Sequence, residues 1–168
     1  MELLEAEITL EDINDFLGQI GEVSEEYDVT IQAIDASYVV GRDHLGQAVR
    51  LADRAFERGE NIARERSVEI LLYAAGTRQI DEALTLGVEP GTQPAVVVVH
   101  DPNGSGDETA ALDAVASLSG VSTAQTIDTF ERNKVQSWFE ISDAELAATD
   151  ATLSELVCER VALLTVEK

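Results

Sequence analysis

The chain has 168 residues, 45% of them apolar, with 11 glycines and 3 prolines, a composition that excludes disordered, collagen-like and disulfide-scaffold proteins. Because no run of about 18 apolar residues occurs, the start of the chain is acidic and there is one cysteine, we expect a single domain over residues 1–168, cytoplasmic and without membrane contact. The 33 acidic and 11 basic residues give a net charge of −22, and this lysine-poor acidity predicts a halophilic, haloarchaeal-type protein, with binding of a basic partner as the alternative.

In chain order, the apolar patterns of the first half predict an edge strand over 2–10, a helix over 11–20, a strand over 29–34 and a helix over 43–57, which Asp43 caps and Gly59 ends. A helix over 78–86 and a central strand over 95–99 follow. The rest of the chain predicts helices over 107–118 and 130–139, a short helix capped by Ser142, a last helix ending at Arg160 and a strand over 161–166. The apolar run 68–75 fits either a buried strand or a core helix. We therefore predict an α/β fold of the α+β type, a single domain with a mixed, largely antiparallel sheet covered by helices.

The charge is segregated along the chain. Residues 42–78 hold seven arginines and six acidic residues, a net charge of +1, so the other 131 residues carry −23. This segment is where an anionic ligand meets the least repulsion. Arg50, Arg54 and Arg58 follow one another at helical i,i+4 spacing, which favours an anion over the stripe, whereas Asp53 and Glu57 at i,i+3 spacing would allow internal ion pairs instead. The residues alone favour neither interpretation.

No motif in the sequence argues for catalysis, a metal site or a cofactor. Gly104-Ser105-Gly106 lacks the spacing of a dinucleotide-binding turn and is followed by acidic residues, so we predict an ordinary surface loop. The two histidines have no nucleophile with an orienting acid nearby in the sequence. We expect His44 to be solvated in the first turn of its helix and His100 to lie at a strand end.

The segment 69–80, with the sequence EILLYAAGTRQI, resembles a family signature of roughly E-I-L-x-x-A-S-G-x-R-Q-I that is followed by a helix. It is similar to the small tRNA-recruiting subunit of the KEOPS complex, whose eukaryotic counterpart is the kinase-binding protein TPRKB. The predicted strands 29–34 and 95–99, the helix 43–57 and the segment 157–164 also occur in family order, whereas residues 101–150 match poorly. Ala75 stands where archaeal members often have serine, which puts a hydroxyl cap there in doubt.

The resemblance implies a non-catalytic subunit that binds the kinase-like ATPase of KEOPS and docks tRNA through its 3′ CCA end, for synthesis of threonylcarbamoyladenosine next to the anticodon. It implies no small-molecule substrate. On this basis we expect Arg78 and Ile80 to contact the CCA end, with Gly76 allowing close backbone approach and the nearby residues Arg64, Arg66 and Asn61 on phosphates. A salt-bridge role for Arg78 and core packing for Ile80 are the structural alternatives.

A second reading of the function stays open: a pure interaction subunit that supports the kinase-like ATPase without touching RNA. The sequence does not identify the face that meets this partner. Its candidates are apolar positions on the first helix (Phe16, Leu17) or on the last helix (Leu153, Leu156, Val157), which could either fill the core or stay exposed for docking.

Overall fold

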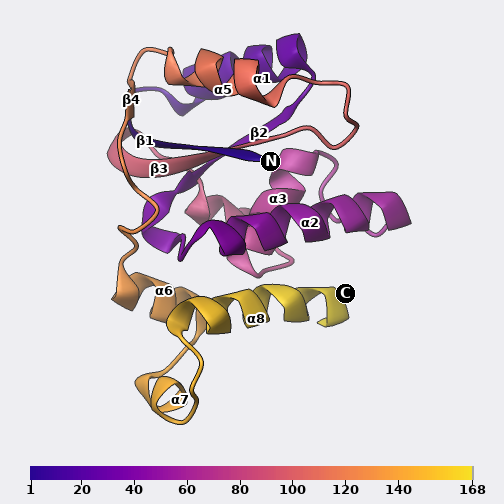
Figure 1. Cartoon of the computed structure of the whole chain (residues 1–168). Coiled ribbons are helices and arrows are strands. Elements are labelled where there is room, and N and C mark those ends of the chain that lie inside the picture. The colour runs from indigo at the N-terminus through magenta and orange to yellow at the C-terminus, as the bar shows by residue number, and fades with distance from the viewer. Residues whose placement is uncertain (168) are drawn as a thin grey trace.

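The computed structural model describes residues 1–167 and is built on a four-stranded sheet with the strand order β2-β3-β1-β4 (Figure 1). Its strands are β1 (Glu2–Leu10), β2 (Thr30–Asp35), β3 (Gly91–His100) and β4 (Val121–Thr123), and every pairing is antiparallel. β3 contains the predicted central strand. β1 is not the predicted edge strand, because β3 pairs along its whole length on one side and the unpredicted β4 pairs with residues 6–8 on the other.

Helices cover both faces of this sheet. α1 (Ile13–Tyr27) and α5 (Glu108–Ala116) lie on one face, and α2 (Arg42–Arg58) and α3 (Arg66–Ala75) lie on the other (Figure 1). Successive side chains of a strand point to opposite faces. Accordingly, Val96 and Val98 of β3 pack with α2 and α3, whereas Val97 and Val99 pack with α1 and α5. The structure therefore confirms a single α+β domain with an antiparallel sheet covered by helices.

The C-terminal part adds a further layer beneath α2. α6 (Arg132–Phe139), α7 (Asp143–Ala147) and α8 (Leu153–Glu167) follow β4, and α8 packs along α2 (Figure 1). Ser142 caps α7 as predicted, with its hydroxyl accepting the N–H of Glu145. The predicted strand over 161–166 is wrong, since these residues continue α8. Val161 and Leu164, three residues apart, are both buried on its inner face.

Several helix boundaries differ from the predictions. α1 runs to Tyr27, beyond the expected 11–20, and begins after a cap by Asp12. Gly41 rather than Asp43 is the N-cap of α2, without a side-chain cap, while Gly59 ends this helix in the left-handed conformation as predicted. The run 68–75 lies in a helix, α3. The predicted helix 78–86 is instead one α-helical turn, α4 (Ile80–Ala83), and the 3-10 turn η2 (Leu84–Leu86).

One more short element, the 3-10 turn η1 (Ala36–Tyr38), joins β2 to the segment before α2. Within residues 1–167, no helix has both the length and the apolar character required to span a membrane. The apolar positions proposed for docking differ in their exposure to solvent. Leu17 is exposed, whereas the other four are buried: Phe16, Leu153, Leu156 and Val157.

Candidate functional site

The signature segment ends α3 in a tight turn at Gly76. Gly76 has φ 65°, and its N–H donates to the carbonyls of Leu72 and Tyr73, which ends the helix. A side chain in this left-handed conformation is strained, and a Cβ on Gly76 would also lie 3.4 Å from the ring of Phe139. The hydroxyl of Thr77 then donates to Glu82 at 2.9 Å and so ties the turn to α4.

A hollow of about 470 Å³ lies beside this turn. It is lined by Ala75, Gly76, Thr77, Glu82, Thr85, Trp138 and Glu140. The indole N–H of Trp138 donates to the carbonyl of Ala75 at 2.8 Å, and its ring meets Tyr38 edge-on with 5.8 Å between centroids. Trp138 is therefore held rigidly with part of its surface on the hollow. The sequence reasoning missed Trp138, because it lies on α6, in the part of the chain where the family resemblance is weakest.

His44 supports the same turn from beneath. Its side chain is fully buried: Nδ1 accepts the N–H of Val40 at 3.4 Å, so Nε2 carries the proton and donates to the carbonyl of Ala74 at 2.8 Å. Burial lowers the pKa of His44 to about 4, opposed by its bond to Ala74. The prediction of a solvated His44 is thus wrong. The imidazole is neutral at pH 7 and joins the start of α2 to the end of α3.

The six residues expected to bind tRNA fall into two groups at opposite ends of α3. Gly76, Arg78 and Ile80 follow its C-terminus, and the second group (Asn61, Arg64, Arg66) lies near its N-terminus. The ten residues of α3 separate the groups by about 15 Å at the usual helical rise. Ile80 is 40% exposed, so it is not a core residue, and Arg78 is exposed too.

Two of the three residues in the N-terminal group already have partners of their own. Arg66 forms an ion pair with Asp53 at 2.6 Å, and its guanidinium lies 4.4 Å from the centroid of the Phe56 ring. The side-chain amide of Asn61 donates to the carbonyl of Ala63 at 2.8 Å and holds the loop before α3. Arg64 is exposed. Of the three, only Arg64 has no hydrogen bond or ion pair with another residue in the part of the chain that the structure describes.

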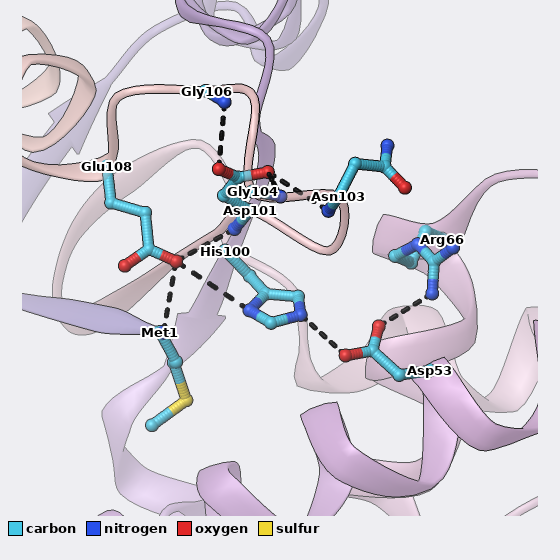
Figure 2. A network of polar contacts seen from close by, with 9 residues as sticks. All are labelled: Met1, Asp53, Arg66, His100, Asp101, Asn103, Gly104, Gly106 and Glu108. Carbon is cyan, nitrogen blue, oxygen red and sulfur yellow. Dashed lines mark hydrogen bonds and ion pairs between the residues drawn. The ribbon is translucent and has the colours of Figure 1, made fainter.

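Asp53 connects Arg66 to a network that links helices on both faces of the sheet (Figure 2). His100, at the end of β3 as predicted, contacts Asp53 through Nε2 at 2.7 Å, and its Nδ1 lies 3.8 Å from Glu108 of α5. Glu108 also pairs with the N-terminal amine of Met1 at 3.0 Å. The network fixes α2 and α5 to the sheet, so we assign it a structural role.

Because Asp53 turns toward this network, it does not pair with Arg50. In the part of the chain that the structure describes, none of the exposed side chains Arg50, Arg54 and Arg58 has an acidic partner within ion-pair distance. Three like charges at i,i+4 spacing repel one another. Of the two interpretations that the sequence left open, the internal ion pairs with Asp53 and Glu57 are therefore not formed among the described residues.

The glycine-rich loop after β3 is organised around its own carboxylate (Figure 2). Asp101 accepts the backbone N–H groups of Asn103, Gly104 and Gly106 at 3.1, 2.9 and 2.8 Å. These bonds, the one from Gly106 foremost, lower the pKa of Asp101. The N–H groups that a phosphate would need are therefore occupied by a side chain. Residues 1–167 also contain no cluster of three His, Cys, Asp or Glu side chains that could hold a metal ion.

The sequence model of one protein family, described as kinase binding protein CGI-121, matches residues 10–165. A comparison with curated proteins found no match. The family match includes the Gly76 turn, the Trp138 hollow and the arginine stripe on α2. It also includes residues 101–150, where the resemblance noted from the sequence was weak.

Proposed function

The chain belongs to the CGI-121 family of non-catalytic kinase-binding proteins, and we propose that in the KEOPS complex it binds the kinase-like ATPase subunit and recruits tRNA through its 3′ CCA end for threonylcarbamoyladenosine synthesis. The observation that carries the RNA part is the Gly76 turn. The turn itself lines a hollow together with Trp138, the one tryptophan of the chain, and it is followed in the sequence by the exposed side chains of Arg78 and Ile80.

The chemistry of the hollow suits unpaired bases. Single-stranded RNA binds by stacking its bases on aromatic or apolar side chains, which Trp138 and Ile80 would provide. Each base of CCA carries an exocyclic amino group, and a carboxylate is the side chain that accepts such a donor. Glu82 and Glu140 line the hollow. They repel the phosphates but would accept hydrogen bonds from the bases.

Phosphates would then be bound outside the hollow, by Arg78 and by the exposed arginines of α2. Arginine donates two parallel hydrogen bonds to a phosphate, and the stripe Arg50, Arg54 and Arg58 lies in the segment of the chain with the least negative charge. Arg64 remains a candidate for the same role. Phosphate contact by Arg66 would require its pair with Asp53 to open, and Asn61 would act by holding the loop.

The experiment is a tRNA binding assay on the isolated protein in molar potassium chloride, the salt that this acidic surface fits if the protein works in a haloarchaeal-type cytoplasm. We expect intact tRNA to bind about tenfold more tightly than tRNA without CCA, because this ratio corresponds to the free energy of stacking about one base. Ile80→Glu, Arg78→Ala and Trp138→Ala should remove that difference. Leu163→Glu, an equally exposed leucine on α8, is the matched control. Equal binding of the two tRNAs would favour a pure interaction subunit.

A further inference from the structure

The two most exposed large apolar side chains among the described residues lie on one groove. Leu17 of α1 is 52% exposed and Leu84 of η2 is 57% exposed. They belong to helical segments on opposite faces of the sheet, yet both line the same two adjoining hollows, of about 540 and 290 Å³, together with Gln32. The groove therefore runs between α1 and the α3–η2 layer.

The floor of this groove is the open edge of the sheet. β2 is an edge strand that pairs with β3 on one side. On its other side, residues 1–167 form a single bridge with it, between Ile34 and Gly87. Residues 30–33 of this edge line the groove. Gln32 partly blunts it, because its side-chain amide donates to the carbonyl of Ala33 at 2.9 Å. An apolar groove over a strand edge is a surface that a protein partner can cover.

The charges around the groove indicate what kind of partner fits. Glu25 and Glu65 line its rim. Among the described residues, Arg66 is the one basic side chain that lines the groove, and it is paired with Asp53. An RNA backbone would be repelled here. A protein surface with apolar side chains at its centre and basic side chains around them would be complementary.

We propose that the kinase partner docks in this groove, by inserting apolar side chains between Leu17 and Leu84 and placing basic side chains opposite Glu25 and Glu65. The proposal rests on the kinase-binding part of the proposed function and is independent of tRNA binding. It selects Leu17 from the apolar positions considered in the sequence, because the other four are buried in the core.

The test measures binding of the cognate kinase to the full chain by calorimetry. We expect Leu17→Asp and Leu84→Asp each to weaken binding at least about tenfold, as for a central interface residue. Leu163→Asp, at a position 43% exposed on α8, should bind as the wild type does. Because these side chains are exposed, the thermal unfolding midpoint of all three variants should stay near that of the wild type. Unchanged kinase binding by both groove variants would overturn the proposal.

Two further measurements separate the possible failures. Hydrogen exchange should slow in residues 13–21 and 84–88 when the kinase is added, and protection confined to α8 would place the interface elsewhere. A groove that instead joins two copies of this chain would show self-association abolished by Leu17→Asp with kinase binding retained, which would also refute the proposal. The tRNA affinity of Leu17→Asp should be unchanged. If the wild type binds tRNA with and without CCA equally well, that result bears only on the tRNA part of the proposed function and not on the kinase groove.

Discussion

Replacing His44 by glutamine tests whether the turn at Gly76 is held by a buried neutral imidazole. In the folded protein, the pKa of His44 is about 4, against an ordinary value of 6.5, because the side chain is fully buried. The unfolded chain therefore binds a proton near pH 6.5 that the folded chain does not bind until about pH 4. The contribution of His44 to stability is complete above pH 6.5 and is lost as the pH falls toward 4.

The size of this loss follows from the two pKa values. Each unit of pKa difference corresponds to about 1.4 kcal/mol once both states are fully titrated. Over the interval from pH 7 to pH 5, the unfolded state protonates while the folded state stays almost neutral, so the wild type should lose about 2 kcal/mol of unfolding free energy through His44. Glutamine does not titrate, and its amide can donate to the carbonyl of Ala74 as Nε2 does.

Urea denaturation of both proteins at pH 7 and pH 5, at constant potassium chloride, gives the required double difference. The many carboxylates also respond to pH, but they are common to both proteins and cancel in the comparison. We expect the stability difference between wild type and His44→Gln to shift by about 2 kcal/mol toward the variant at pH 5. A shift near zero would mean that His44 is accessible to protons in the folded state, which would refute the buried geometry.

Three further predictions concern the same framework. Gly76→Ala should destabilise the protein by about 1 to 2 kcal/mol, and more than Gly59→Ala, since both glycines have a left-handed backbone but only a Cβ at Gly76 meets another side chain; urea midpoints of the two variants give the comparison. Glu69→Ala should cost about 3 kcal/mol by the same measurement, because the buried carboxylate accepts the N–H groups of Ile62 and Ala63. The thermal midpoint of the wild type should rise between about 0.1 and about 2 M potassium chloride, because salt screens the repulsion within a net charge of −22. A falling midpoint would contradict this.

The sequence predicts correctly those elements whose pattern of apolar residues follows from the side that they bury. The valine run of β3 and the apolar stripe of α2 identified their elements correctly. α3 could not be assigned, because every residue from Glu69 to Ala75 is buried and a helix enclosed on all sides has no polar face. The end of α8 was mistaken for a strand because local β-branched residues favour that structure. Its packing against α2 decides in favour of a helix, and contacts of this kind are not encoded locally.

The candidate site was predictable only in part, for the same reason. The signature identified Gly76, Arg78 and Ile80, which the structure keeps together. Trp138 lies 62 residues after Gly76 in the chain. Only the packing of α6 against the end of α3 brings its ring to the Gly76 turn. The division of the arginines into paired and unpaired groups depended on which way Asp53 points, which spacing along α2 does not determine.

The segment α4–η2 belongs to both proposed surfaces, and this has a thermodynamic consequence. Glu82 and Thr85 line the hollow beside Gly76, whereas Leu84 lines the kinase groove. α4 begins without a side-chain cap, and the buried side chains Ala83 and Leu86 anchor the segment. A partner that repositions this segment from one side must alter the other side, and any coupling between two binding sites at equilibrium is reciprocal.

The factor by which saturating kinase changes the affinity for tRNA should therefore equal the factor by which tRNA changes the affinity for kinase. Leu84→Asp should lose kinase binding while keeping the tRNA affinity of the free chain. A kinase effect on tRNA binding that persists in Leu84→Asp would show that the coupling does not pass through this segment.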